Sequence, residues 1–178
     1  YTGDGNDNAK FFHGLTRAPE LVILKDRDNA STNWRVGVTA LDSSYDQVLN
    51  LNLSNSAASA STIFSAVAPT ATVITLGTET DANGSGRKFI CYCFASREGF
   101  SKFGSYQGGS DPFVYLGFEP AMIIFKRSTG TATHWAIRDN ARKTDNPNRN
   151  TLYPSKSDAE YTGTAHDIDF LSNGFKMR

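Results

Sequence analysis

Several features that mark common functional classes are missing from this sequence. Its 18 basic and 18 acidic residues give a formal net charge of zero, so the chain lacks the basic field that nucleic-acid binding requires. Its longest apolar run, residues 89–95, is far too short to cross a membrane. No signal peptide opens the chain, which begins at Tyr1 rather than at Met. We therefore expect no nucleic-acid partner, no membrane span and a segment cut from a longer polypeptide.

Cysteine is also scarce, with only Cys91 and Cys93 in the chain. Alternate residues of a strand point to the same face roughly 6.6 Å apart, which is near the upper limit for a disulfide. We expect buried free thiols, and the pair argues against a disulfide-stapled secreted module.

The sequence contains no recognisable catalytic motif. It has no P-loop, no Rossmann fingerprint and no Gly-x-Ser-x-Gly elbow. Its histidines, His13, His134 and His166, lack the spacing of metal ligands. Asp167 and Asp169 are candidates for acid–base chemistry beside His166, but carboxylates two residues apart usually mark the solvent face of a strand. We predict a non-enzymatic protein with no catalytic, cofactor-binding or metal-binding residue and no cofactor.

One acidic stretch, residues 4–8 (Asp-Gly-Asn-Asp-Asn), resembles the opening of a calcium-binding loop. The EF-hand pattern requires Gly at its sixth position and Glu at its twelfth. Those positions are Ala9 and Leu15 here, so we interpret the stretch as a polar turn.

The clearest positive signal is an internal repeat. Residues 19–25 (Pro-Glu-Leu-Val-Ile-Leu-Lys) resemble residues 120–126 (Pro-Ala-Met-Ile-Ile-Phe-Lys), at an offset of 101 residues. The same offset aligns further residues in pairs: Trp34 with Trp135, Leu51 with Leu152, Ser56 with Ser157, and Ile74 with Phe175. We therefore predict two diverged copies of one β-rich unit.

The predicted copies differ in completeness. The first copy spans residues 1–105 and includes a last strand at 88–95 and a linker. The second copy spans residues 106–178 and has no counterpart of residues 88–95. A missing strand leaves an unpaired sheet edge. Either a neighbouring chain or the residues that follow Arg178 would supply it.

The local pattern predicts an all-β fold, a β-sandwich with jelly-roll-like packing. Short apolar or aromatic runs lie between Gly, Asn, Asp, Ser and Pro residues. The expected strands are residues 21–25, 33–38, 48–53, 72–76, 88–95, 113–116, 122–127, 134–138 and 168–171, with a hairpin turn at 172–175. Residues 57–68 form the one expected helix, and residues 158–160 are a candidate helical turn.

Two blocks of the sequence resemble a known family. The first block is residues 99–106 (Gly-Phe-Ser-Lys-Phe-Gly-Ser-Tyr) with Gly108, residues 112–115 and residues 117–121. The second is residues 151–154 (Thr-Leu-Tyr-Pro) with residues 169–176 (Asp-Phe-Leu-Ser-Asn-Gly-Phe-Lys). Both are similar to the repeated domains of tail-fibre and related virion proteins of marine tailed phages, including cyanophages. The resemblance implies a virion appendage or adhesin and carries over no catalytic residue.

The first copy departs from this pattern, because it has His13-Gly14-Leu15 where the second copy has Leu116-Gly117-Phe118. The two copies therefore need not bind the same thing.

Aromatic residues are the natural candidates for sugar binding. Trp34 and Trp135 occupy matched positions within expected strands, which favours the core over a ligand site. If glycans bind, loop tyrosines are better candidates, and no single one is preferred: Tyr45, Tyr115, Tyr153 and Tyr161. The glycan-binding residues are thus unknown from the sequence.

We expect a structural and adhesive segment of a phage tail fibre or other extracellular virion appendage, which contributes to host-surface attachment. The expected partners are copies of the chain, with a trimer favoured, other virion proteins and host-surface polysaccharide. Two alternatives remain open, a carbohydrate-binding module of a secreted or surface protein and part of a polysaccharide depolymerase.

Overall fold

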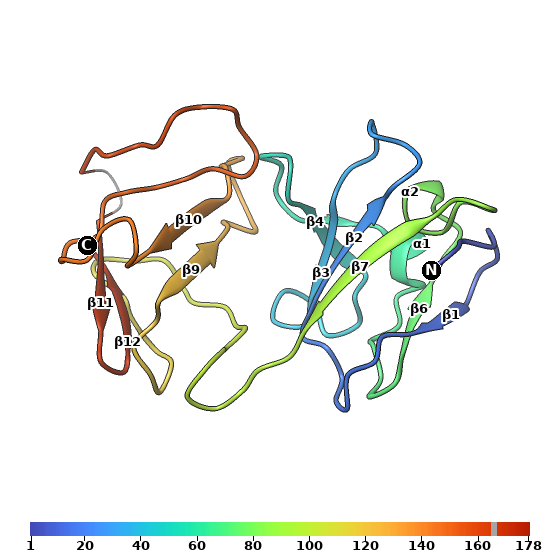
Figure 1. The fold of residues 1–178 in the computed structure, drawn as a ribbon, viewed down its shortest axis with the longest axis horizontal. Helices are drawn as coiled ribbons and strands as arrows, with labels where there is room; N and C mark the ends of the chain where they lie inside the picture. The colour runs from blue at the N-terminus through green and yellow to red at the C-terminus, as the bar shows by residue number, and fades with distance from the viewer. Residues whose placement is uncertain (165–166) are drawn as a thin grey trace.

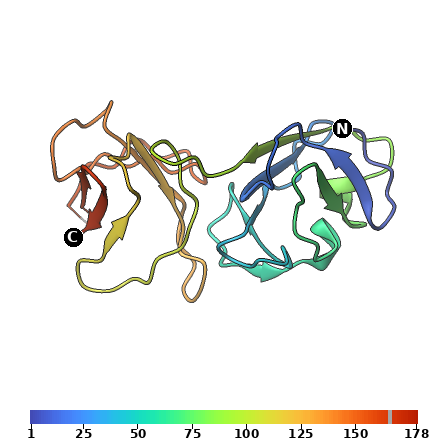
Figure 2. The same cartoon turned by 90° about the horizontal axis from the view of Figure 1, so that it is seen from below.

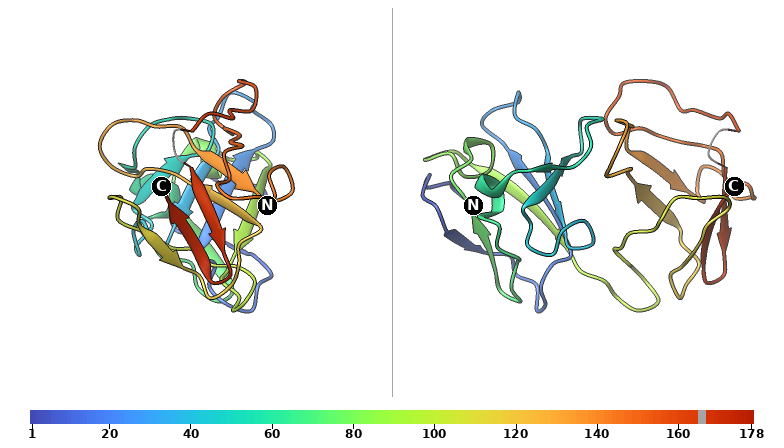
Figure 3. Two further views of the ribbon diagram at one scale, coloured as in Figure 1. Left: turned by 90° about the vertical axis from the view of Figure 1, so that its left-hand side faces the viewer. Right: turned by 180° about the vertical axis from the view of Figure 1, so that it is seen from behind.

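The computed structural model of the chain describes residues 1–164 and 167–178, so the expectation for His166 lies outside the described residues. Within the described part, short antiparallel strands and two one-turn helices form two halves that lie side by side along the long axis (Figure 1). The views in Figure 2 and Figure 3 show the linker after β7 crossing from the first half to the second. The all-β prediction is confirmed at this level.

A five-stranded sheet is the frame of the first half. Its strand order is β5-β4-β3-β2-β7, with every neighbouring pair antiparallel. The strands are β5 (Ala58–Ser59), β4 (Gln47–Asn50), β3 (Arg35–Val38), β2 (Leu21–Asp26) and β7 (Phe89–Phe94). Along β2, Val22 and Leu24 are buried and their neighbours are only partly buried, as the twofold period of a strand dictates.

A second sheet of two strands, β1 (Ala9–Phe12) and β6 (Val73–Leu76), packs against the inner face of the first together with α1 (Ser61–Phe64) and α2 (Thr80–Asn83). Gly37 is required on β3, because a Cβ there would lie 2.5 Å from Cδ1 of Tyr45 and 2.8 Å from Cε2 of Phe64. The buried core of this half consists of Val22, Leu24, Tyr45, Val48, Ile63, Phe64, Ile74, Leu76 and Ala82.

The second half is built from two smaller sheets. One sheet pairs β9 (Met122–Phe125) with β10 (Ala136–Asp139), and the other has the order β11-β12-β8. The strands of the latter are β11 (Ile168–Leu171), β12 (Gly174–Met177) and β8 (Phe113–Tyr115). The buried apolar core that they share is Ile123, Ile168, Phe170 and Phe175.

Strand pairing has the same register in both halves. In the first half Val22 lies opposite Gly37, and in the second Ile123 lies opposite Arg138, each 101 residues later. The whole β2–β3 register recurs in β9–β10 with this offset, including the bond from the Thr39 amide to the Glu20 carbonyl, which recurs as Asn140 to Ala121. The β1–β6 pairing recurs in β8–β12, where β12 lies 101 residues after β6 and β8 lies 103 residues after β1.

Trp135 joins the two halves. Its side chain packs against Val36 and Leu49 on the outer face of the five-stranded sheet, and its Nε1 donates to the Asn50 carbonyl at 2.8 Å. The Ala57 amide also donates to the Ser128 carbonyl across this junction. The buried tryptophan thus acts between the halves rather than inside the second one.

The expected strands are present with ends that differ by at most three residues. The helix expected over residues 57–68 is wrong, since only residues 61–64 are helical. Ser65 and Ala66 have positive φ, and Ser65 Oγ donates to Asp7 and to the Leu76 carbonyl. Such side-chain bonds compete with the helix. The candidate helical turn at residues 158–160 is wrong as well, because this segment is irregular.

The first core makes a testable prediction. Phe64 is fully buried and its ring meets Tyr45 edge-on at 5.3 Å, so Phe64→Ala should lower the free energy of unfolding by about 3–5 kcal/mol. Phe12→Ala is the matched control, because Phe12 is 81% exposed and should change stability by less than about 0.5 kcal/mol. Urea unfolding measures both, and equal effects would contradict this description of the core.

Candidate functional site

A row of apolar side chains points outward from β7. Ile90, Tyr92 and Phe94 are 37%, 40% and 43% exposed, while Phe89 on the opposite face is buried. We call these three residues the β7 outer surface. Neighbouring aromatic rings extend it, since Trp34 stacks on Tyr92 at 6.3 Å and Phe103 lies 6.1 Å from Phe94. Trp135 covers the β3–β4 part of the same sheet face and leaves this part open.

The second half has a corresponding surface on β9. Met122 is 57% exposed and Ile124 is 47% exposed, and we call these two residues the β9 outer surface. Ile137 on β10 lies opposite Ile124, and Leu152 forms a bridge to Ile137, so the apolar face continues across three segments. Exposed apolar patches of this kind commonly mark interaction sites.

A polar cavity of about 280 Å³ lies among the loops of the second half. Asn148 on its wall is 1% exposed, and its Nδ2 donates to the carbonyls of Asp139 and Lys143 at 2.7 and 3.0 Å. Its Oδ1 has no hydrogen-bond partner among the described residues. Glu119 and Asn140 also line the cavity. Asn148 Oδ1 is thus a buried acceptor that no described group satisfies.

The predicted carboxylate pair lies in a different environment from the one expected. Asp167 and Asp169 are buried rather than on a solvent face, and they pair with Arg149 at 3.1 Å and Arg178 at 2.7 Å. Arg138, also buried, donates to the Asn148 carbonyl, and burial lowers the pKa of Arg138 while Asp167 opposes that shift. Because a carboxylate buried alone is costly, each is paired with a cation.

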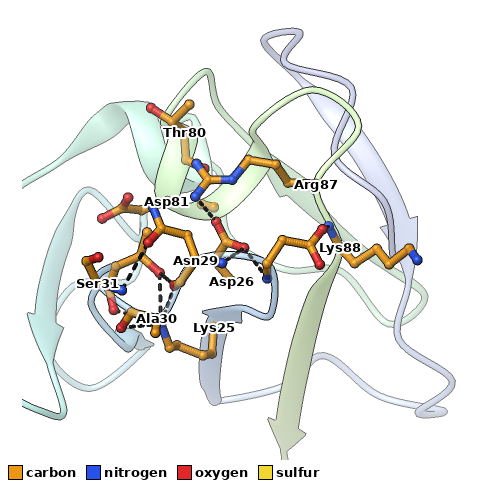
Figure 4. Close-up of polar contacts among 12 residues, drawn as sticks. Lys25, Asp26, Asn29, Ala30, Ser31, Thr80, Asp81, Arg87 and Lys88 are labelled. Atoms are coloured by element: carbon orange, nitrogen blue, oxygen red, sulfur yellow. Dashed lines mark hydrogen bonds and ion pairs between the residues drawn. The ribbon is translucent and has the colours of Figure 1, made fainter.

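A second charged cluster lies at the end of β2 (Figure 4). Asp26 is 1% exposed; its Oδ2 lies 2.5 Å from Arg87 Nη2, and its Oδ1 accepts from the amides of Asp28 and Asn29. Lys25 Nζ donates to the carbonyls of Asn29 and Thr32 at 3.0 and 2.8 Å. These bonds fix the β2–β3 turn against the start of β7, which is a structural role.

The thiols of Cys91 and Cys93 are free, as predicted, with their sulfurs 3.3 Å apart. They are only partly buried, because they face a cavity of about 630 Å³ between β7 and β1 that Tyr1 and Phe11 also line. The hydrogen bond that the Cys91 thiol shares with Cys93, together with burial, raises the pKa of Cys91.

The candidate tyrosines do not gather into one site. Tyr45 is wrong as a loop ligand, because it is fully buried and its hydroxyl donates to the Pro19 carbonyl at 3.2 Å. Tyr115 is 61% exposed and Tyr161 is 38% exposed, while Tyr153 is half-buried under Lys156. The structure brings none of these rings together.

The tryptophans also behave differently from each other. Trp135 is buried, but against Val36 and Leu49 of the first half rather than in the core of its own half. Trp34 is only half-buried at the edge of the β7 outer surface.

The acidic stretch at residues 4–8 forms part of a turn against Asn83. The Asp4 amide donates to Asn83 Oδ1 at 3.1 Å, and Asn83 Nδ2 donates to the Asn6 carbonyl. In the described part of the chain, no three His, Cys, Asp or Glu side chains come together as metal ligands would.

Sequence reasoning missed the polar cavity. The register places Arg138 where the first half has Gly37, and the loop after β10 carries Asn146 where the loop after β3 carries Tyr45. Polar side chains thus replace the aromatic packing of the first half. The outward residues of β7, by contrast, follow directly from alternation along residues 89–94.

A family model, "Domain of unknown function (DUF7483)", matches residues 1–178. The chain belongs to the DUF7483 family. No curated protein and no solved structure matches the DUF7483 chain. Within its described residues, no helix has the length and apolar character needed to cross a membrane.

Burial of Tyr45 predicts a pH dependence of stability. Burial raises the pKa of Tyr45 from 10.0 to about 12, so its stabilising contribution is complete below pH 10 and is lost as the pH rises from 10 through 12. The Tyr45 contribution to this loss should reach about 2–3 kcal/mol. Tyr45→Phe should cost about 1 kcal/mol near neutral pH and should make the decline above pH 10 smaller by the Tyr45 contribution.

Urea unfolding across this pH range measures both effects, with the exposed Tyr115→Phe as the control. A decline of the same size in Tyr45→Phe and the wild type would contradict the assignment.

Proposed function

We propose that the chain is a non-enzymatic structural and adhesive segment of a phage tail fibre or other extracellular virion appendage. The observation that carries the proposal is the pair of outer surfaces on β7 and β9, which present large apolar side chains to solvent. A chain with zero net charge has little charge repulsion to keep such surfaces apart. Association with further copies, in a trimer, would cover them.

The repeat supports this role. We interpret the chain as two diverged β-sandwich units with jelly-roll-like packing, at residues 1–105 and 106–178, because the β2–β3 register recurs in β9–β10 at an offset of 101 residues and the β1–β6 register recurs in β8–β12. Repeated units on several chains multiply weak contacts to host-surface polysaccharide and to other virion proteins. The resemblance of residues 99–121 and 151–176 to marine-phage tail-fibre repeats points to the same setting.

Light scattering coupled to size-exclusion chromatography tests the assembly. We expect the mass of three chains for the wild type, and the mass of one chain for Tyr92→Lys, because a charge on the β7 outer surface is costly to bury. Phe12→Lys is the control, since Phe12 is exposed outside this surface. A wild-type monomer at all concentrations, together with no antibody labelling of virions in electron micrographs, would refute the proposal.

The polar cavity favours a second function, that of a carbohydrate-binding module. Sugars present many hydroxyl donors, and Asn148 Oδ1 is a buried acceptor without a partner in the described structure. Phe170 adds an apolar surface to the lining.

Titration with host-surface oligosaccharides tests this second function by calorimetry. Glu119→Gln and Lys143→Ala should each weaken binding by about tenfold, because each removes one charged hydrogen-bonding group from the lining. Tyr115→Ala, outside the cavity, should leave the affinity unchanged. If Tyr115→Ala alone weakens binding, the sugar binds elsewhere.

A further inference from the structure

β9 has a free edge. It pairs with β10 along one side, and no other strand of residues 1–164 and 167–178 pairs along the opposite side. The four residues of β9, Met-Ile-Ile-Phe, include neither a proline nor a charge. Edge strands that stay free usually carry such protection against pairing with another chain. An apolar edge of this kind can pair with a strand from elsewhere.

The first half indicates what such an edge accepts. β2 holds the same position relative to β3 as β9 holds relative to β10, residue for residue. The edge of β2 away from β3 is paired with β7 along all six residues, antiparallel, with Ile23 opposite Tyr92 and Leu21 opposite Phe94. At the 101-residue offset, Ile124 and Met122 correspond to Ile23 and Leu21. On the edge away from β10 they have no paired strand among the described residues.

We propose that the free edge of β9 binds an extended, β7-like strand donated by another polypeptide chain. The strand runs antiparallel to β9 and places large apolar side chains opposite Met122 and Ile124, on the β9 outer surface. Small side chains such as those of Cys91 and Cys93 lie on the other face, opposite Ile123 and Phe125. Backbone hydrogen bonds supply the affinity and the alternate side chains supply the register.

The chain's own β7 is not available for this edge. It is paired with β2, the Phe89 amide donates to the Tyr1 carbonyl, and Arg87 is fixed to Asp26. The other described strands are paired as well. The donor strand therefore lies outside the described residues.

The first half has a side-chain contact beside its β2–β7 pairing that the second half lacks, and this difference affects how tightly a donated strand would be held. In the first half Glu20 accepts from both the amide and the hydroxyl of Ser96 at 2.8 and 2.9 Å, which fixes the strand that leaves β7. Ala121 stands at the matching position before β9 and cannot do this. The donated strand is held by its backbone ladder and apolar contacts alone, so it exchanges more readily than β7.

Hydrogen exchange with mass spectrometry on the full chain tests the proposal. The probe is a peptide of residues 87–96 with both cysteines replaced by serine. Saturating peptide should slow deuterium uptake in residues 121–127 by about tenfold, because free amides of β9 become hydrogen-bonded. The control peptide has the same side chains and is N-methylated at the alternate amides that would face β9, so it should give no protection.

Two variants locate the contact. Ile124→Lys should abolish the protection, whereas Ile90→Lys, an outward position on β7 that the probe does not touch, should retain it. No slowing in the wild type, or equal slowing by the N-methylated peptide, would overturn the proposal. In Tyr92→Lys, which removes the trimer contact proposed above, protection of β9 that depends on chain concentration without any peptide would also overturn the proposal, because the occupant would then be a second copy of this chain.

Discussion

The exposed surfaces of this molecule follow from the contact that Trp135 makes across its two halves. The indole packs on Val36 and Leu49 and donates to the Asn50 carbonyl, so it covers the β3–β4 part of the outer face of the five-stranded sheet. The rest of that face, on β7, stays open, as does the face of β9. The indole therefore buries the β3–β4 part of this face, while Ile90, Tyr92 and Phe94 remain exposed. The contrast between the covered part of the face at β3–β4 and the exposed part on β7 is a stronger guide to function than any polar cluster in the described structure.

The strands were predictable because short apolar runs stand between turn-forming residues. Residues 21–25 are an example, since four consecutive apolar residues follow Pro19 and Glu20 and become β2. The 101-residue offset aligned the segments that become β2 and β3 with those that become β9 and β10, although their pairings and registers required the structure. The helix at residues 57–68 failed for a physical reason. Composition suggested a helix former, but a serine hydroxyl bonded to distant groups ends it after one turn.

The polar sites were harder to predict because burial of a polar residue depends on partners far away in sequence. Asp169 alternates like a surface residue, yet Arg178 neutralises it and allows its burial. Tyr45 follows a polar turn, but the absence of a side chain at Gly37 leaves room for its ring in the core. The cavity beside Asn148 exists because the second half replaces this aromatic packing with Arg138 and Asn146. No pattern in the local sequence indicates such a replacement of aromatic by polar packing.

The first half closes through contacts between its two ends, and these contacts affect how the chain folds. Tyr1 exchanges hydrogen bonds with Phe89, and Gly3 donates to the Arg87 carbonyl, so the two ends of this half meet across more than eighty residues. Contacts so distant in sequence require a large loss of chain entropy before they stabilise anything, and folding dominated by them takes roughly milliseconds to seconds. On the ribosome, β2 therefore remains an open edge until β7 has emerged. During synthesis the nascent first half presents the same kind of unpaired strand that the finished second half keeps permanently.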